Sequence, residues 1–196
     1  MRSSAADPMA RLYYNDYEAE GSGAKSDAVF NLVSGLVSRG VPIDGVGWQW
    51  HKISGSNATV TSAHANNAAR IANLGLELMI TEADVRIQLP TTAAKLQQQA
   101  AEYRSLWNFC LNTAICRGVV TWGFTDKYSW VPSVFSGFGD ALILDVNYQP
   151  KPAYTAIDQL LGGVGGQTLT VNKAGAGRGT VTSRPGGISR GTGCTR

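Results

Sequence analysis

The sequence of 196 residues lacks features that mark several classes of protein. No apolar run is long enough to cross a bilayer, so we expect no membrane span and no membrane partner. Residues 1–7 lack the apolar stretch of a secretory signal peptide. The net charge is only +3 and the basic residues are dispersed, which argues against a nucleic-acid partner.

Cysteine is scarce, with three residues in the chain. Cys110 and Cys116 could form a disulfide between the end of one helix and the next strand. Two free buried thiols explain the pattern about as well while the compartment is unknown. Cys194 has no further partner in the chain, which indicates that a segment before or after it is missing.

Hydrophobic residues make up 43% of the chain, enough for one sizeable core. Strands are expected at residues 11–17, 43–51, 76–85 and 118–126, with a short one at 141–146. Helices are expected at about 26–40, 60–74, 92–111 and 152–161. Helix–strand alternation predicts a parallel sheet with right-handed crossovers, which amounts to half of an eightfold α/β barrel.

Two of the expected helices carry an apolar stripe at the 3.6-residue spacing of a packed face. The first stripe consists of Val29, Leu32, Val33, Leu36 and Val37. The second consists of Leu96, Ala100, Tyr103, Trp107, Cys110 and Leu111. We expect both stripes to face the core.

The segment at 76–85 changes from apolar to polar along its length. Its first half reads as a strand buried on both faces of a parallel sheet. Glu82 and Asp84 follow two residues apart, so period-two geometry sends them to the same side. Chemistry in α/β folds concentrates at such strand ends, although a solvated loop with acids facing water is the plain alternative.

Five motifs lie at these strand ends and beyond. They are Leu-Tyr-Tyr-Asn-Asp-Tyr at 12–17, Gly-Val-Pro-Ile-Asp-Gly-Val-Gly at 40–47, Ile-Thr-Glu-Ala-Asp-Val at 80–85, Val-Thr-Trp-Gly-Phe-Thr-Asp-Lys-Tyr-Ser-Trp at 120–130, and Asp-Val-Asn-Tyr-Gln-Pro-Lys-Pro-Ala-Tyr at 145–154. In order and spacing they resemble the family-10 glycoside hydrolases, which are retaining endo-1,4-β-xylanases. The resemblance runs from about residue 12 to residue 161.

The resemblance implies a partial (β/α)8 TIM barrel that contains strands five to eight with their helices. Residues 1–161 would then be the C-terminal half of the catalytic barrel. Residues 162–168 read as a Gly-rich linker. Residues 169–196 read as the start of a truncated β-rich accessory module, with short strands at 169–171 and 179–182. A disulfide between Cys110 and Cys116 also matches one often present in the family.

A retaining glycosidase needs a carboxylate nucleophile and a second carboxyl group that acts first as acid and then as base. By resemblance, Glu82 is the nucleophile. His51, at the end of a neighbouring strand, is placed to donate to Glu82, and Asp84 to hold the other ring nitrogen. For His51 alone, a structural histidine is the alternative.

Other strand-end residues suit a sugar-binding cleft. Asn15, Tyr17 and Gln49 offer hydrogen bonds to hydroxyl groups, and Trp122 and Trp130 offer flat faces for pyranose rings. Each of them could instead be an ordinary core residue. Neither a cofactor nor a metal ion is expected.

The sequence also departs from the family pattern. The family's acid/base glutamate follows an asparagine at the end of strand four, and no Asn-Glu pair occurs in this sequence. Glu18, Glu20 and Asp126 do not match that motif. Glu18 also stands where the family usually has asparagine, and Trp50 where a small polar residue is common.

The resemblance therefore predicts a fragment of an endo-1,4-β-xylanase that acts with retention through a glycosyl-enzyme intermediate on Glu82. Its partners would be xylan and xylo-oligosaccharides, and the full-length parent would be secreted. The alternative is a non-catalytic, carbohydrate-binding or structural half-barrel. Exposed half-barrel edges would in either case favour self-association.

Overall fold

The computed structural model describes residues 7, 9–162, 181–182 and 189–190. The chain divides into two compact units, Met1–Val164 and Gly165–Arg196. In the second unit, β7 (Val181–Thr182) pairs with antiparallel β8 (Ser189–Arg190). The linker expected at 162–168, apart from Gly162, the strand expected at 169–171, and Cys194 lie outside the described residues.

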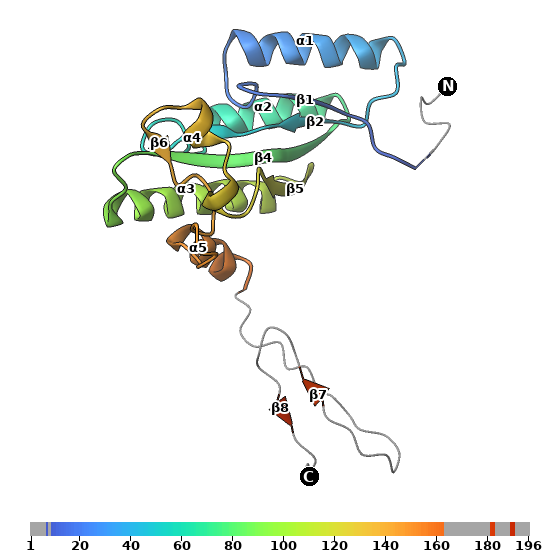
Figure 1. The fold of residues 1–196 in the computed structure, drawn as a ribbon. Coiled ribbons are helices and arrows are strands. Elements are labelled where there is room, and N and C mark those ends of the chain that lie inside the picture. Colours follow the sequence, from blue (N-terminus) through green and yellow to red (C-terminus); the bar gives the residue numbers. More distant parts are fainter. Residues whose placement is uncertain (1–6, 8, 163–180, 183–188, 191–196) are drawn as a thin grey trace, which may run out of the picture. The chain divides into compact units, whose positions relative to one another are not determined.

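The first unit is built on a parallel sheet (Figure 1). Its strands β1 (Tyr13–Asp16), β2 (Gly45–Trp48), β4 (Glu77–Gln88) and β5 (Cys116–Thr121) lie side by side in that order. A short strand, β3 (His51–Ile53), continues the chain after β2 and pairs with the later part of β4. The parallel order predicted from the sequence is confirmed, and it is consistent with part of a barrel.

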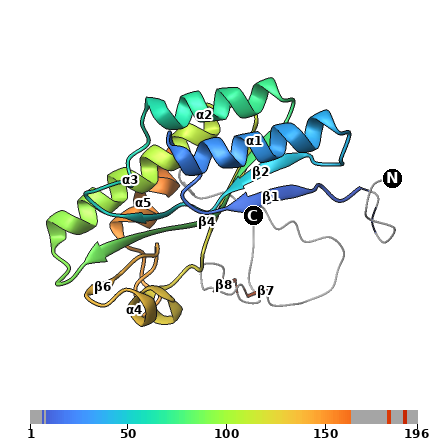
Figure 2. The same cartoon turned by 90° about the horizontal axis from the view of Figure 1, so that it is seen from above.

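Helices connect these strands. The long ones are α1 (Ala24–Ser38), α2 (Ser62–Asn73), α3 (Ala93–Leu111) and α5 (Pro152–Leu160). Thr92 caps α3 by accepting a hydrogen bond from the Lys95 N–H, and Thr61 and His64 form a reciprocal capping box at α2. Figure 2 shows α1 beside α2 and, separately, α3 beside α5. A short 3-10 helix (Asp126–Tyr128) and α4 (Val131–Val134) follow β5.

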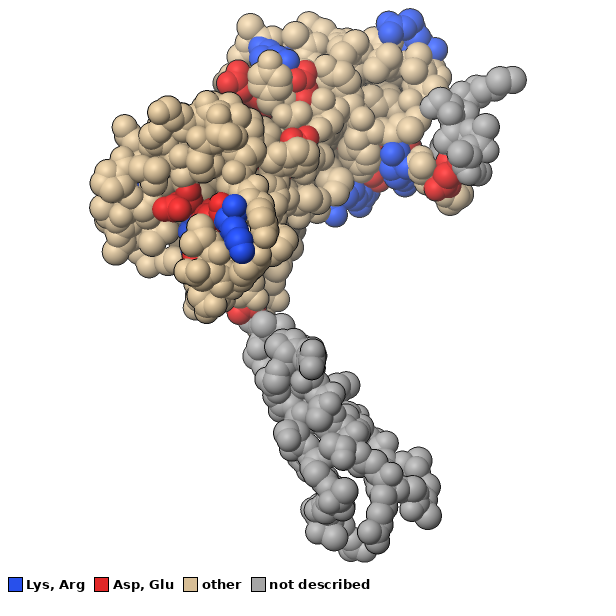
Figure 3. Space-filling view, viewed as in Figure 1, with Lys and Arg blue, Asp and Glu red and all other residues tan. Residues whose placement is uncertain are grey.

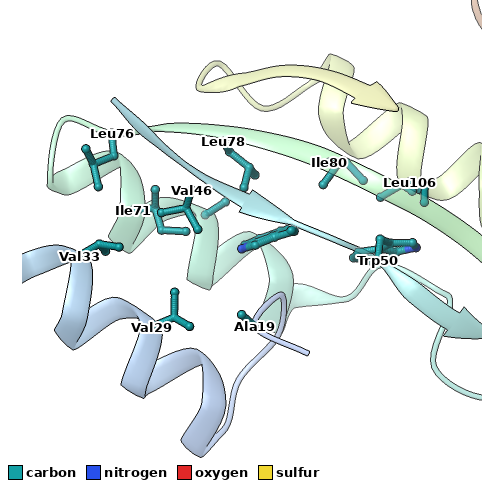
Figure 4. Packing of buried hydrophobic residues seen from close by; sticks show 13 residues of the cluster. Ala19, Val29, Val33, Val46, Trp50, Ile71, Leu76, Leu78, Ile80 and Leu106 are labelled. Atoms are coloured by element: carbon teal, nitrogen blue, oxygen red, sulfur yellow. The ribbon is translucent and has the colours of Figure 1, made fainter. Parts of the chain in front are cut away.

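Buried apolar side chains fill the space between the sheet and these helices. The main cluster includes Val33 of α1, Ile71 of α2, Leu106 of α3, and Leu78 and Ile80 of β4 (Figure 4). A second cluster joins Val85 of β4 to Tyr103 of α3 and Ile157 of α5. β4 contributes to both clusters, so it forms the centre of the unit.

Two residues expected in the core are exposed. Leu32 of α1 is 42% exposed and Leu111 of α3 is 59% exposed. In α1 the buried positions are Ser26, Val29 and Val33, because small and β-branched residues face the sheet. In α3, Leu106 is fully buried although the sequence pattern did not select it.

Three strand predictions need correction. The strand expected at 43–51 is divided at Trp50, whose φ of 67° interrupts the extended chain. The strand expected at 118–126 ends at Thr121, where Gly123 with φ of 103° turns the backbone. Residues 141–146 form no strand within the described part of the chain: Leu144 makes only isolated bridges.

A segment just before residues 141–146 pairs with β4 instead. The strand β6 (Phe138–Gly139) runs antiparallel to the end of β4, at Ile87 and Gln88. After Leu144 the chain turns at Asp145, whose Oδ1 accepts the N–H groups of Asn147 and Gln149. This turn leads to Lys151 and into α5.

The end of α3 is joined to the start of β5 by a disulfide between Cys110 and Cys116, with an S–S distance of 2.00 Å. Charged side chains are spread over the face seen in Figure 3, where uncharged residues predominate. None of the helices among the described residues is long and apolar enough to cross a membrane.

Candidate active site

A histidine and two carboxylates meet at the C-terminal ends of the parallel strands. His51 pairs in register with Asp84, because β3 runs beside the later part of β4. The His51 Nδ1 atom lies 2.9 Å from Asp84 Oδ2, and Nε2 lies 3.3 Å from Glu82 Oε2. Glu82 and Asp84 therefore share one side of β4, as their two-residue spacing predicts.

The His51 imidazole lies in an acidic environment. Burial works to lower the pKa of His51, but hydrogen bonds and charge attraction from Asp84 and then Glu82 outweigh it and raise this pKa above its ordinary value. A protonated imidazole has two N–H donors, so it can donate to Asp84 and Glu82 at once. A neutral imidazole bonded to Asp84 through Nδ1–H would turn an acceptor toward Glu82.

Asp84 is the fully buried member of this group, with 0% of its surface exposed. Besides His51, it accepts a hydrogen bond of 2.7 Å from the indole Nε1–H of Trp130. The two donors fix one carboxylate oxygen, and this oxygen in turn fixes the direction of the imidazole. Asp84 is thus built to hold His51 rather than to reach a bound molecule.

Asn15 holds the other oxygen of Glu82. Its Nδ2 group donates to Glu82 Oε1 at 2.8 Å, and its Oδ1 accepts from the Thr81 hydroxyl at 2.7 Å. Asn15 reaches β4 across Gly47 of β2, where a Cβ atom would come within 2.5 Å of Asn15 Oδ1. Sequence reasoning missed the roles of Thr81 and Gly47, and the signal for them was a glycine between two strands that carry polar ends.

Aromatic rings border the same site. The Trp130 ring lies 5.0 Å from the His51 ring and the Trp122 ring 6.4 Å from it, both edge to face. Trp122 is 48% exposed, so part of its indole is accessible to a ligand. Tyr17 is also exposed and lies under the Lys25 ammonium group, 4.6 Å from its ring centroid.

The structure brings together Glu82, His51, Asp84, Asn15, Trp122 and Trp130. Tyr17 and Gln49 follow the neighbouring strands β1 and β2, and the Gln49 N–H donates to the Asp16 carbonyl. The contacts place these two residues at the same edge of the sheet but do not show their side chains bonded to the group.

Two further acidic residues near these strand ends form ion pairs with lysines. The Glu20 carboxylate is 1% exposed and accepts from Lys52 Nζ at 2.8 Å. Asp126 accepts from Lys151 Nζ at 2.8 Å, and burial raises the pKa of Asp126 despite that cation. Glu20 and Asp126, which do not match the family's acid/base motif, are thus both paired with lysines.

Among the described residues, no group of three or more His, Cys, Asp or Glu side chains is arranged to hold a metal ion. The strand ends carry a carboxylate held by an amide and an imidazole, beside the half-exposed indole of Trp122.

A family model described as "Glycosyl hydrolase family 10" matches residues 2–160. The chain belongs to this family. The match covers the whole of the parallel sheet, so the resemblance found in the strand-end motifs is confirmed. The family-10 chain thus presents its two neighbouring carboxylates at the strand ends where α/β barrels carry their chemistry.

Characterised relatives share this stretch. An endo-1,4-beta-xylanase of Agaricus bisporus is 47% identical over 152 residues, which are 78% of this chain and 45% of the relative. Endo-1,4-beta-xylanase B of Thermotoga neapolitana is 46% identical over 158 residues, which cover 80% of this chain and 45% of the relative. The chain spans about half the length of the curated relatives that it matches.

Solved structures give the same result. The crystal structure of xylanase 10B from Thermotoga petrophila RKU-1 in complex with xylobiose matches with a TM-score of 0.75 and 45% identity. That match covers 80% of this chain and 48% of the other. The family-10 chain therefore has the fold of about half of that enzyme.

Proposed function

We propose that this chain is the nucleophile-bearing half of a retaining endo-1,4-β-xylanase, with Glu82 as the nucleophile. The observation that carries the proposal is the position of the Glu82 carboxylate between the Asn15 amide and the His51 imidazole. Attack on an anomeric carbon requires a carboxylate oxygen held in a fixed direction, and these two contacts hold the two oxygens of Glu82.

The residues around Glu82 take supporting roles in this proposal. His51, held by Asp84, fixes the direction of the nucleophile. Asn15, Tyr17 and Gln49 donate to or accept from sugar hydroxyl groups, and Trp122 and Trp130 stack against pyranose faces. The xylanase relatives, one of them solved with xylobiose, support xylan and xylo-oligosaccharides as the substrate class.

The mechanism requires a second carboxyl group about 5–5.5 Å from the first, to protonate the leaving oxygen and then activate water. Glu20 and Asp126 are held in buried lysine pairs, which supports placing the acid elsewhere. We place it in the part of the barrel that the relatives contain and this chain does not span. Residues 1–161 then form the C-terminal half of that barrel, followed by the linker at 162–168 and an accessory module from 169.

Secretion of the full-length parent is part of the proposal. The support is the disulfide between Cys110 and Cys116, because disulfides persist in oxidising compartments outside the cytosol.

An activated substrate tests the nucleophile without the acid. A 2-deoxy-2-fluoro-β-xylobioside with a 2,4-dinitrophenolate leaving group needs no protonation: a bond forms from a Glu82 oxygen to C1 as the bond to dinitrophenolate breaks. The fluorine slows the second step, so the sugar remains attached. We expect one fluoroxylobiosyl unit per chain, mapped by peptide mass to Glu82. Glu82→Gln is the matched control and should stay unlabelled.

A label on another carboxylate would show that Glu82 is not the nucleophile. A chain that binds xylo-oligosaccharides but takes no label would instead favour the second candidate, a non-catalytic half-barrel that binds through its indole faces. The exposed side chain of Trp122 favours this candidate specifically.

The chain by itself should hydrolyse natural xylan poorly, since general-acid help is typically worth about 10²–10⁴-fold. It should also self-associate through its exposed half-barrel edges. Light scattering combined with a reducing-sugar assay measures both properties. A monodisperse monomer with ordinary xylanase turnover would contradict the half-site assignment.

A further inference from the structure

A single buried carboxylate bonds to the residues on both sides of His51. Glu20 Oε1 accepts the Trp50 backbone N–H at 3.1 Å, and Glu20 Oε2 accepts from Lys52 Nζ at 2.8 Å. Glu20 is 1% exposed and Lys52 is 7% exposed. Successive residues of a strand face opposite ways, so Lys52 points to Glu20 while His51 points to Asp84 and Glu82.

The backbone before His51 is unusual enough to need such support. Trp48 is paired with Ile80 and His51 with Asp84. The advance of three residues from β2 to β3 therefore lies opposite an advance of four residues along β4. Trp50 absorbs the mismatch with φ of 67°, a left-handed conformation that costs a bulky residue about 1–3 kcal/mol. Its indole is fully buried at the junction of the two strands (Figure 4).

Glu20 is itself anchored to the helical layer. The Asn67 side-chain amide of α2 donates to the carbonyl oxygens of Ala19 at 2.7 Å and of Glu20 at 3.0 Å. Arg70 Nε in turn donates to Asn67 Oδ1 at 2.6 Å. A continuous set of contacts therefore runs from α2 through Glu20 to both neighbours of His51.

We propose that Glu20 and Lys52 are positioning residues that fix the direction of the His51 imidazole and, through it, the Glu82 carboxylate. The effect on Glu82 rests on the proposed function. The effect on His51 does not, because the contact between His51 and Asp84 is independent of the role of Glu82.

A second buried pair in the same chain provides the matched control. Asp126 Oδ2 accepts from Lys151 Nζ at 2.8 Å, and Asp126 Oδ1 accepts the Leu142 N–H at 2.8 Å. This carboxylate therefore makes the same two kinds of bond as Glu20, and its side chain is also largely buried, with 4% exposed against 1% for Glu20. It differs in that neither of its partners adjoins His51.

The test replaces each pair without changing net charge. Glu20→Met with Lys52→Met removes the proposed support, and Asp126→Leu with Lys151→Met removes the control pair. NMR of the full 196-residue chain then follows the His51 Nδ1–H proton and the pKa of His51. The charged groups that face this imidazole are Asp84 and Glu82, both on β4, and neither pair of substitutions alters them.

We expect the first double variant to lose the hydrogen-bonded Nδ1–H signal and to bring the pKa of His51 down toward its ordinary value. The control double variant should change neither. An unchanged His51 in the first variant, or equal changes in both, would overturn the proposal and leave Glu20 and Lys52 as a pair that only stabilises the fold.

Two further measurements cover a variant that fails to fold. Glu20→Gln with Lys52→Met keeps an acceptor for the Trp50 N–H, so it should fold and shift His51 less. In the unaltered chain, the Trp50 amide hydrogen should exchange with solvent as slowly as that of Trp48. Fast exchange at Trp50 alone would also overturn the proposal. Fluorosugar labelling of Glu82 tests the proposed function separately from all these readouts.

Discussion

The two histidines of the chain lie close to Trp50 and have opposite surroundings. His51 follows Trp50 directly and faces two carboxylates, which raise its pKa despite burial. The His64 ring lies 5.0 Å from the Trp50 ring, and burial together with the Lys52 ammonium group lowers the pKa of His64. The surroundings of each ring in the fold decide its role: one imidazole is suited to carry a proton at the strand ends, and the other caps α2 while neutral.

The largest effect should come from removing the carboxylate that His51 faces. In a complete family-10 domain that contains this chain, Glu82→Ala should lower the rate of xylan hydrolysis by about 3–6 orders of magnitude, because covalent catalysis is lost. Added azide should restore part of the turnover by replacing the missing nucleophile. Activity within tenfold of the unaltered domain would contradict the assignment.

Exchanging each histidine for glutamine should separate the two roles. In the same domain, His51→Gln should lower kcat by about 10–10²-fold, since a displaced nucleophile is costly even when substrate binds normally. His64→Gln should leave kcat nearly unchanged and lower stability by about 1 kcal/mol, because the capping box at Thr61 is weakened. Steady-state kinetics and urea unfolding measure the two effects, and equal losses of kcat would remove the distinction.

Removing the disulfide should lower stability without changing the pKa of either histidine, so it serves as a reference for the two histidine variants. The bridge closes a short loop between α3 and β5, so Cys110→Ala with Cys116→Ala should lower the free energy of unfolding by roughly 2–3 kcal/mol. The His51 and His64 pKa values, followed by NMR, should stay as they are. Before substitution, thiol counting under denaturing, non-reducing conditions should detect Cys194 alone, and three free thiols in protein made under oxidising conditions would show that the bridge is not formed.

The smallest effect is the dependence of stability on pH, and its sign differs between the histidines. The His51 pKa is raised on folding, so its contribution is full below about pH 6.5 and is lost as pH rises through the folded pKa. The His64 pKa is lowered, so its contribution is full above about pH 6.5 and is lost as pH falls through the folded pKa.

Urea unfolding across about pH 4–9, which extends roughly two units to either side of an ordinary histidine pKa, checks these signs. His51→Gln should flatten the loss of stability on the alkaline side, and His64→Gln the loss on the acidic side. Each unit of pKa difference between the folded and unfolded states corresponds to about 1.4 kcal/mol. A His51→Gln profile that changes only below pH 6 would reverse the assignment.

Much of the sheet could be predicted because β2 and the first half of β4 are rich in apolar residues and the apolar residues of the helices repeat about every 3.6 positions. Residues 76–85 read as a strand from their apolar run, and the shared side of Glu82 and Asp84 follows from period two alone. The break at Trp50 could not be predicted, because the N–H of this left-handed residue is bonded to Glu20, which lies 30 positions away in the sequence.

The contacts of the site depended on pairings between distant residues. Asn15 and Glu82 are 67 positions apart and meet only because β2 carries glycine at position 47 between them. The antiparallel pairing of β6 likewise depends on where the chain returns after α4, which local patterns do not contain. The role proposed for Glu82 comes from the family resemblance. The residues alone predicted only that Glu82 lies on the same side of the strand as Asp84.

The twelve-residue strand β4 pairs with β2, β3, β5 and β6, whereas β1 pairs only with β2 among the strands that the structure describes. This arrangement constrains the order in which the chain acquires structure during synthesis. Until residues 77–88 have left the ribosome, β3 lacks its partner strand, β2 lacks its partner on one side, and α1 and α2 have little sheet to cover. Contacts of such long sequence separation form slowly, so the emerging chain passes through a stage in which its apolar strands are exposed to chaperones and proteases.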